Sequence, residues 1–383
     1  MKHVMIEIAY YIASKAKQIL GGTLSVNQYK DYVLALLFLK SANEYYKSND
    51  SFQSDENKPL LRLLVSERSS FDYLYKQLGS AELGKLINVA LYELEQANSR
   101  VIEGYEINRA INFESNILGD TNERLGKLHE LLRLFQKLTL TDDAGKLIDI
   151  GALYNQLLYI FAEEAGKKIS NVLTPKEVIG LVAELIGNNK DNNSLCDPVS
   201  GSGTLLVEVG KRVGIRGVGI FGQEANWNQY ALTKMNLMLN GFKDSTFFWG
   251  DSLSNPKLTD GDRLKQFDIV VSIPPFADKW AIEEAEFDRY ERFQYGIPPR
   301  SQATWAYISH ILASLKPNGR AVVVVPAGVL FRTSESKIRH QIIEHNLLET
   351  VIELPQNLFY GTAISTAILV FRKNRETTQT LFM

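Results

Sequence analysis

Three carboxylates follow three short apolar runs in the second half of this 383-residue chain, and a glycine-rich turn follows the first of them. The run Leu195–Cys196 ends at Asp197, and the glycines Gly201 and Gly203 come shortly afterwards. Glycine permits a tight turn and lets a ligand approach the main chain. The amides of such a turn and of the following helix would face that ligand. The turn indicates a nucleotide-type ligand, although a plain connection between strand and helix explains it equally well.

The second and third carboxylates favour the ligand. Glu224 ends the run 217–223, and Asp251 follows the run 247–249. A carboxylate about 20 residues beyond the glycine turn, at the end of a second strand, is placed to accept hydrogen bonds from two ribose hydroxyls. Asp251 would suit an adenine amino group. Since parallel strands end at the same edge of a sheet, we expect Asp197, Glu224 and Asp251 to line one crevice.

A fourth apolar run, 267–273, leads into Pro274-Pro275-Phe276. Proline cannot continue a strand ladder, so this tripeptide predicts the exit loop of a strand. Two further apolar segments, 351–355 and 359–373, are expected to supply the last strands as a hairpin, and 380–382 a final strand. The lone His310 in an apolar helical stretch is expected to be a packing residue rather than a catalytic one.

The order of these motifs resembles adenine-N6 DNA methyltransferases, and most of all HsdM, the modification subunit of type I restriction-modification systems. The motifs are Asp-Pro-x-x-Gly-Ser-Gly at 197–203, Gly-Gln-Glu at 222–224, the segment 231–241, and Gly-Asp-Ser-Leu at 250–253. The resemblance implies an α/β fold, in which a Rossmann-like S-adenosylmethionine-dependent methyltransferase domain with a doubly wound, mostly parallel sheet follows an α-helical N-terminal domain.

S-adenosylmethionine is the cofactor that the resemblance implies. The residues that would hold it are Thr174, Pro175, Asp197, Pro198, Gly201, Ser202, Gly203, Glu224, Asp251, Ser252 and Leu253. In the family, the segment matching Thr174-Pro175 lies over the methionine end of the cofactor. From the residues alone, the pair is equally well explained as an N-cap followed by a proline in the first helical turn.

The catalytic loop of the family reads Asn or Asp, then Pro-Pro and Tyr or Phe. The Asn oxygen and the first proline carbonyl hold the amine hydrogens of a flipped adenine, and the aromatic ring stacks on the base. The corresponding residues here are Ile273, Pro274, Pro275 and Phe276. Isoleucine has no acceptor, and losing an acceptor at a reacting centre costs on the order of a hundredfold in rate. We therefore expect the fold of a methyltransferase with weak or absent transfer.

The distribution of proline marks a domain boundary, because only Pro59 precedes Pro175. The first part has apolar residues at helical spacing, for example in 28–40 and 125–135. We predict a helical domain over 1–165, which would clamp DNA and contact partners, and a catalytic domain over 166–383. An all-α interaction or scaffolding domain is the alternative for the first part. However, 32–40 and 150–162 resemble the helical N-terminal domain of HsdM subunits.

Composition constrains the partners and the location. A net charge of −2 and a pI near 6.3 are unhelpful to a protein that grips DNA alone. The resemblance implies double-stranded DNA, an HsdS-like specificity subunit, a restriction subunit and a second copy of the chain as partners. HsdM subunits usually continue into C-terminal helices that pack on the specificity subunit, so the end at Met383 leads us to expect a truncated chain.

The single cysteine, Cys196, fits a reducing cytoplasm, and the start of the chain lacks the pattern of a secretory signal. No apolar run is long enough to span a membrane, and no cysteine-histidine cluster indicates a metal site. We expect a cytoplasmic protein.

Two other functions are considered. A degenerate, non-catalytic methyltransferase that binds cofactor or DNA within an assembly is favoured by Ile273. A dinucleotide oxidoreductase is disfavoured, because Asp-Pro-x-x-Gly-Ser-Gly is not the Gly-x-Gly-x-x-Gly turn and Pro-Pro-Phe has no role there.

Overall fold

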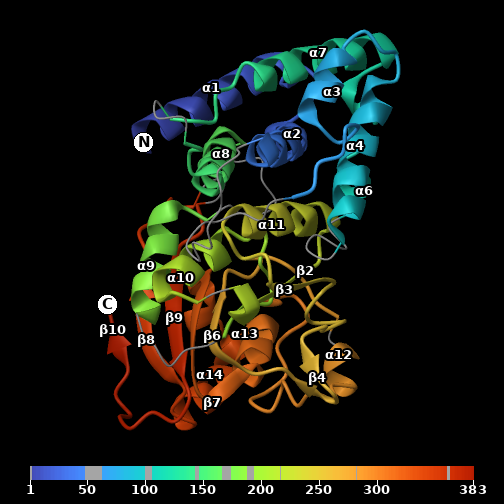
Figure 1. Cartoon of the computed structure of the whole chain (residues 1–383). Helices are drawn as coiled ribbons and strands as arrows, with labels where there is room; N and C mark the ends of the chain where they lie inside the picture. Colours follow the sequence, from blue (N-terminus) through green and yellow to red (C-terminus); the bar gives the residue numbers. More distant parts are fainter. Residues whose placement is uncertain are drawn as a thin grey trace. The chain divides into compact units, whose positions relative to one another are not determined.

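The computed structural model of the chain describes residues 2–47, 63–99, 106–142, 146–165, 174–187, 194–215, 217–281, 283–359 and 363–383. The chain divides into two compact units (Figure 1). One unit comprises residues 1–166 and 227–244, and the other comprises residues 167–226 and 245–383.

The first unit is helical. Its described helices are α1 (Lys2–Leu20), α2 (Val26–Lys47), α3 (Phe71–Lys76), α4 (Leu83–Ala97), α6 (Ile107–Ala110), the 3-10 helix η1 (Asn116–Leu118), α7 (Thr121–Gln136), α8 (Ile150–Ala165) and α11 (Trp227–Leu239). In Figure 1, α2 and α8 lie between α1 and α11. Every residue of α2 from Tyr29 to Asn43 is buried, as expected of a central helix that packs on all sides.

Helix α11 shares the core of this helical unit, although the chain reaches it between two strands of the other unit. Its Met235 and Met238 join the apolar cluster of the helical unit, and the Tyr154 hydroxyl of α8 donates to the Leu232 carbonyl over 3.1 Å. A Cβ on Gly151 would lie 2.6 Å from the Leu239 carbonyl oxygen, so the close approach of α8 and α11 requires glycine there. The predicted division at 165/166 does not anticipate this packing, and the division itself stays a prediction.

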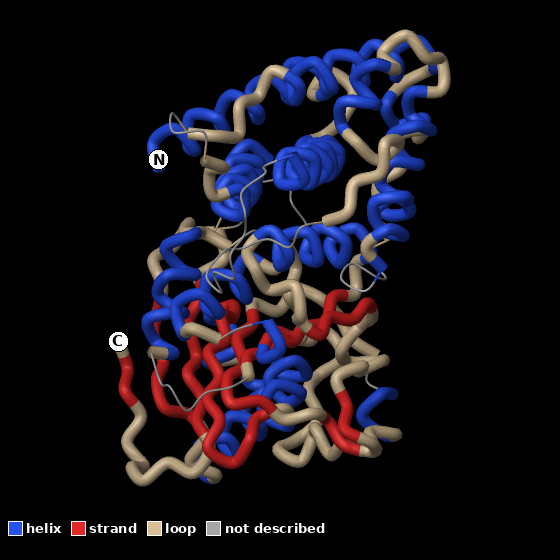
Figure 2. The backbone as a smooth tube through the Cα atoms, viewed as in Figure 1, coloured by secondary structure: helices blue, strands red, loops and turns tan. Residues whose placement is uncertain are grey.

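The second unit is built on an eight-stranded sheet, whose strands are drawn in red in Figure 2. Its strands are β1 (Leu195–Asp197), β2 (Ile220–Glu224), β3 (Thr246–Trp249), β6 (Phe267–Ser272), β7 (Leu315–Pro326), β8 (Leu348–Glu353), β9 (Thr366–Arg372) and β10 (Leu381–Phe382). The strand order is β10-β8-β9-β7-β6-β1-β2-β3, and only β9 runs antiparallel to its neighbours within this sheet. A small hairpin of β4 (Thr259–Asp260) and β5 (Arg263–Leu264) accompanies the sheet.

The sheet has a topological switch point between β1 and β6. The chain runs from β1 outward to β2 and β3, and it then returns to the other side of β1 as β6. Leu195 and Cys196 of β1 pair with Ile269 and Val270 of β6 in parallel register. Open α/β sheets bind ligands beyond the carboxyl ends of the strands at such a point. The doubly wound, mostly parallel sheet expected from the motifs is confirmed.

Helices cover the sheet, so its central strands are buried on both faces. The helices packed on it include α9 (Lys176–Ile186), α10 (Thr204–Val213), α13 (Thr304–Ala313) and α14 (Ser336–Glu344). The unit also contains α12 (Glu283–Glu286) and the 3-10 helices η3 (Gly217–Gly219), η4 (Ala327–Leu330) and η5 (Thr333–Glu335). Residues 321–325 of β7 are all fully buried, which explains their unbroken apolar run. Ile308 of α13 and Ile338 of α14 pack in the same cluster as Val323.

Two strand predictions need adjustment at their ends. The strand expected over 217–224 begins only at Ile220, because 217–219 form a 3-10 turn. The expected closing hairpin is present as β8 and β9, but β9 begins at Thr366 rather than in the region 359–364. Residues 360–362 lie outside the described residues. The expected final strand is present as β10, which pairs in parallel with β8.

No helix in the described ranges is both long and apolar enough to cross a bilayer.

Two glycine substitutions test how tightly the sheet unit is packed. A Cβ on Gly222 in β2 would overlap the Phe247 ring and lie 3.1 Å from Leu206 Cδ1, whereas one on Gly180 in α9 would meet nothing within 4 Å. We expect Gly222→Ala to lower the free energy of unfolding by about 1–3 kcal/mol through overpacking. Gly180→Ala should raise it by up to about 1 kcal/mol, because alanine favours the helix. Denaturant titration measures both, and equal stability of the two variants would contradict the packing.

Candidate active site

Four neighbouring parallel strands end at one edge of the sheet, and each ends at or beside a residue singled out by the sequence. Asp197 is the last residue of β1, and Glu224 is the last residue of β2. Asp251 follows β3, and Ile273 follows β6 directly. Asp197, Glu224 and Asp251 are called the acidic cluster below. The site residues expected from the strand ends therefore belong to adjacent strands, in the order β6-β1-β2-β3.

Asp197 connects the two strands at the switch point. Its side chain is buried, and its Oδ1 accepts hydrogen bonds of 2.9 Å from the Val199 amide and from the Ser272 hydroxyl at the end of β6. Burial raises the pKa of the Asp197 carboxyl to about 7, although these two hydrogen bonds act to lower it. The negative charge of Glu224 raises this pKa further, so the two strand ends are close enough to interact electrostatically.

The glycine turn after Asp197 has the left-handed geometry that its residues predict. Gly201 has φ of 54° and Gly203 has φ of 73°, and Gly203 precedes the first residue of α10 as its N-cap. Side chains other than glycine rarely adopt these angles. A Cβ on Gly201 would meet no atom within 4 Å, so the main chain of the turn faces open space.

Glu224 is held against the glycine turn. Its Oε2 accepts a hydrogen bond of 2.8 Å from the Gly201 amide, and its Oε1 accepts one of 2.7 Å from the Asn226 amide. Burial raises the pKa of the Glu224 carboxyl, these amides lower it, and the charge of Asp251 raises it. A hydrogen bond thus joins the end of the second strand to the turn after the first, and the charge of Asp251 after the third strand acts on Glu224.

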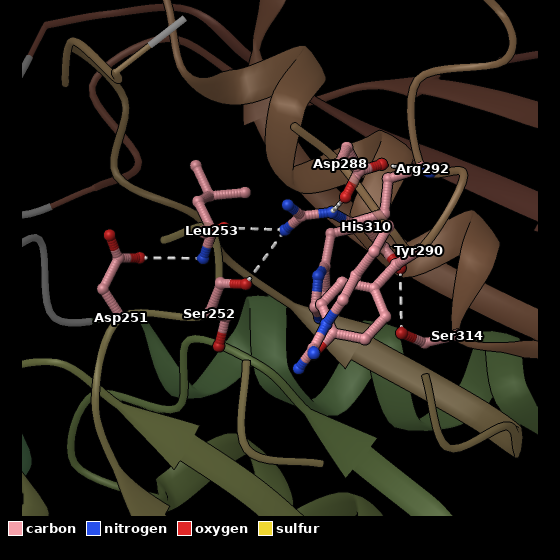
Figure 3. A network of polar contacts seen from close by, with 9 residues as sticks. Asp251, Ser252, Leu253, Asp288, Tyr290, Arg292, His310 and Ser314 are labelled. Atoms are coloured by element: carbon pink, nitrogen blue, oxygen red, sulfur yellow. Dashed lines mark hydrogen bonds and ion pairs between the residues drawn. The ribbon is translucent and has the colours of Figure 1, made fainter. Parts of the chain in front are cut away.

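The segment after β3 is fastened on two sides. The Asp251 carboxylate accepts from the Leu253 amide over 3.0 Å and from the Ser254 hydroxyl over 2.9 Å. The Ser252 hydroxyl donates to the Pro198 carbonyl over 2.6 Å, which joins this segment to the segment after β1. From the other side, the Arg292 guanidinium donates to main-chain carbonyls of the segment (Figure 3).

The loop after β6 begins where Pro-Pro predicts, because the strand ends at Ser272. Ile273 and Pro275 are partly buried, whereas Pro274 and Phe276 are buried. The Phe276 ring lies 5.4 Å from the Phe359 ring, centroid to centroid, in an edge-to-face arrangement. Position 273 therefore carries an apolar side chain next to Ser272, the last residue of β6, whose hydroxyl donates to Asp197 at the end of β1.

Two residues near the acidic cluster were not identified from the sequence. Tyr307 of α13 is buried, and burial together with the charges of Asp251, Asp278 and Glu224 raises its pKa well above the ordinary value. Burial, and then the charge of Asp251, raises the pKa of Asp278, which lies two residues after Phe276. An aromatic residue in an apolar helix and an acid in a loop carry no local signal for such a position.

The expectation for Thr174 and Pro175 needs a correction. Helix α9 begins at Lys176, and Pro175 itself occupies the N-cap position with φ of −57° and ψ of 141°. Thr174 is therefore not the cap, because the helical conformation starts one residue later than predicted. Among the described residues, no hydrogen bond links Thr174 or Pro175 with the acidic cluster.

His310 packs inside the sheet unit. Burial, and then the positive charge of Arg292, lowers its pKa to about 3, so it is neutral at physiological pH. The packing role expected for His310 stays a prediction. Among the described residues, no group of three or more His, Cys, Asp or Glu side chains is arranged to hold a metal ion.

Comparison with known families matches both parts of the chain. Residues 147–383 match the family described as N-6 DNA Methylase, and residues 13–135 match the HsdM N-terminal domain. This chain belongs to the N-6 DNA methylase family. The resemblance to HsdM subunits is thereby confirmed.

Individual relatives of this N-6 DNA methylase agree. The chain is 32% identical over 274 residues to the type I restriction enzyme MpnII methylase subunit of Mycoplasma pneumoniae. The aligned residues cover 68% of this chain and 50% of the relative. It is 29% identical over 378 residues to the type I restriction enzyme MjaVII methylase subunit of Methanocaldococcus jannaschii, covering 90% of this chain and 62% of the relative. The chain therefore spans about half to two thirds of the length of these relatives.

Solved structures share the fold. The type I restriction-modification methyltransferase subunit from Streptococcus thermophilus superposes with a TM-score of 0.81 at 24% identity, covering all of this chain and 87% of that one. A Listeria monocytogenes protein described as a class I S-adenosylmethionine-dependent methyltransferase gives a TM-score of 0.54 at 19% identity, covering 83% and 93%. The Rossmann-like methyltransferase fold with a helical N-terminal domain is confirmed.

The raised pKa of Asp197 predicts a pH dependence of stability. A folded pKa of about 7 lies above that of about 4 for an exposed aspartate. The protonated carboxyl is thus favoured in the folded state, and its contribution to stability, complete below about pH 4, is lost as the pH rises through about 7. Asp197→Asn stays neutral throughout, so its free energy of unfolding should fall less steeply than that of the unmodified chain over this window. Denaturant titrations at several pH values measure this, and parallel curves would contradict it.

Proposed function

We propose that this chain is the adenine-N6 DNA methyltransferase subunit of a type I restriction-modification system, in which Ile273 leaves methyl transfer weak. The observation that carries the proposal is the meeting of the acidic cluster, the glycine turn and the Pro-Pro-Phe loop at one switch point. Open α/β sheets bind ligands at such a point. The relatives named as type I methylase subunits support the same function.

The strand ends fit the chemistry of S-adenosylmethionine. Glu224 lies at the end of the second strand, where a carboxylate accepts from ribose hydroxyls, and Asp251 would accept from the adenine amine. Gly201 turns with a positive φ and faces open space, which lets a ligand approach the main chain. The other residues expected from the family are Pro198, Ser202, Gly203, Ser252 and Leu253, with Thr174 and Pro175 at the methionine end. When bound, the cofactor supplies an electrophilic methyl group on a sulfonium.

The target adenine would lie against the loop after β6. The Pro274 carbonyl would accept one hydrogen of the exocyclic amine, and the Phe276 ring would stack on the flipped base. With the amine held in this way, its nitrogen would face the methyl group that the bound cofactor supplies, and the proton released on transfer would pass to water. Ile273 accepts no hydrogen bond, so the second amine hydrogen has no partner there. The neighbouring Ser272 is fully buried, and its hydroxyl donates to Asp197 of β1.

The proposed function requires DNA and partner subunits. We propose double-stranded DNA as the substrate, with an HsdS-like specificity subunit, a restriction subunit and a second copy of the chain in a cytoplasmic assembly. The near-neutral net charge of −2 supports a partner that contributes to the grip on DNA. The helical domain over 1–165 would clamp DNA and contact these partners, and the domain over 166–383 would carry the chemistry.

One observation favours a second function. Because the acceptor expected at position 273 is replaced by a partly buried apolar side chain, the chain would suit a degenerate methyltransferase that binds cofactor or DNA without turnover. The two functions share the cofactor site and differ only in catalysis.

A substitution at position 273 separates these two functions. Restoring the acceptor with Ile273→Asn should raise the rate of methyl transfer about a hundredfold or more. Ile273→Val is the matched control, since it changes the volume and adds no acceptor. The measurement is transfer of tritiated methyl groups to cognate DNA with the specificity partner present. If the unmodified chain and the Asn variant are equally fast, Ile273 does not disable the site. If the Asn variant binds cofactor and DNA yet stays inactive, the non-catalytic function is favoured.

Cofactor binding tests the acidic cluster independently of turnover. Glu224→Gln and Asp251→Asn should each weaken S-adenosylmethionine binding about tenfold or more, because each loses a charged acceptor for the ligand. Asp260→Asn, an exposed acid in the β4–β5 hairpin, serves as the control and should leave the affinity unchanged. Calorimetric titration gives the dissociation constants. Tight binding of NADH in place of S-adenosylmethionine would point to the oxidoreductase instead.

A further inference from the structure

The segment between β6 and α13 folds back on itself and is closed by hydrogen bonds between its two ends. Described as residues 273–281 and 283–303, it is closed by main-chain hydrogen bonds from Trp280 to Arg300 over 3.2 Å and from Ala303 to Asp278 over 2.8 Å. The Trp280 indole donates to the Pro299 carbonyl over 3.2 Å. This segment, called the exit loop below, therefore holds its side chains in defined positions although most of it is irregular.

The exit loop contains a fully buried ion pair between Arg292 and Asp288. Arg292 Nε lies 2.7 Å from one Asp288 oxygen, and the Arg292 amide donates to the other oxygen over 2.6 Å. The two side chains are only 3% and 4% exposed. Taking two charges out of water is costly, and apolar residues of similar size often stabilise a fold as well or better. Stability of the loop is thus a weak reason for this pair.

The rest of the Arg292 guanidinium reaches the segment after β3. Arg292 Nη1 donates to the Leu253 carbonyl over 2.8 Å and to the Ser252 carbonyl over 3.3 Å, as Figure 3 shows. The Leu253 amide in turn donates to the Asp251 carboxylate over 3.0 Å. A continuous chain of hydrogen bonds therefore runs from Asp288 through Arg292 and Leu253 to Asp251.

Asp288 orients the donors of Arg292. Its carboxylate takes the Nε hydrogen and the main-chain amide, so the planar guanidinium can present Nη1 to the two carbonyls in one orientation only. The Tyr290 and Phe293 rings lie 5.7 and 5.3 Å from the guanidinium carbon and add to this restraint. A lysine has neither the planar fork nor the number of donors to do the same.

We propose that Arg292, held by Asp288, is a positioning residue that fixes residues 251–253 for the adenine ring of the cofactor. This inference rests on the proposed cofactor site at Asp251. The exit loop carries Phe276 of the base site at one end and Arg292 farther along. The same loop that receives the target base therefore sets the geometry of the adenosine site, through the carbonyls of Ser252 and Leu253.

The test is calorimetric titration of the full chain with S-adenosylmethionine and, separately, with adenosine. Arg292→Gln should weaken both ligands by a similar factor of about tenfold or more, because the change acts at the adenine end; Arg292→Lys should give a smaller loss. The matched control is Arg320→Gln, which removes a partly buried ion pair with Glu349 in the same sheet unit. Arg320 pairs with Ile269, away from the carboxyl ends of the strands. The affinity of the Arg320→Gln variant for both ligands should therefore stay within about twofold of that of the unmodified chain.

A double variant keeps the test informative if Arg292→Gln fails to fold. Arg292→Met combined with Asp288→Leu replaces both charges by apolar groups, which a fold usually tolerates, and removes the donors to Ser252 and Leu253. We expect a folded chain, verified by circular dichroism, that binds adenosine as weakly as Arg292→Gln. If the unmodified chain binds and this folded variant binds equally tightly, the inference is wrong and the proposed function stands. If the unmodified chain binds neither ligand, the proposed function fails and takes this inference with it.

Discussion

The candidate site depends on one hydrogen bond across the switch point, from the Ser272 hydroxyl to the Asp197 carboxylate. It joins the ends of β1 and β6, the two strands between which the order of the sheet reverses. Burial raises the pKa of the Asp197 carboxyl there. The hydrogen bonds from the Ser272 hydroxyl and the Val199 amide partly offset this rise. The turn after β1 and the loop after β6 therefore leave the sheet from a common point, and Glu224 attaches to the same turn through Gly201.

This hydrogen bond explains why the acidic cluster and the loop after β6 can change independently of each other. Among the described residues, the hydrogen bonds accepted by Asp197, Glu224 and Asp251 come from main-chain amides and hydroxyls, and Ile273 donates none of them. The apolar residue at position 273 therefore leaves the hydrogen bonds of the acidic cluster intact, and under the proposed function it offers no acceptor to the target base. The fold and the proposed cofactor site are therefore independent of the residue at position 273.

Long-range contacts also organise the periphery of the site. Arg292 lies far along the exit loop, yet its guanidinium contacts the carbonyls beside Asp251. The charges of Asp251, Asp278 and Glu224 act on the buried Tyr307 of α13 and raise its pKa. The segment 231–241, which resembles a motif of the family, contains most of α11, and its Met235 and Met238 pack in the core of the helical unit. The segments that follow the strands thus serve packing and positioning as well as the direct contacts that their motifs suggest.

The sequence by itself determined the features that depend on local backbone chemistry: the turn at Gly201 and Gly203, the acidic strand ends and the exit of β6 before Pro274. Glycine and proline restrict or release φ in their own residue, so their effect can be predicted without the rest of the fold. The tertiary structure alone decided the burial of the Arg292 and Asp288 pair, the approach of Tyr307, the core membership of α11 and the cap of α9 at Pro175. Except for the cap, which differs by one residue, these features arise from contacts between segments distant in the sequence, for which residue type and spacing carry no signal.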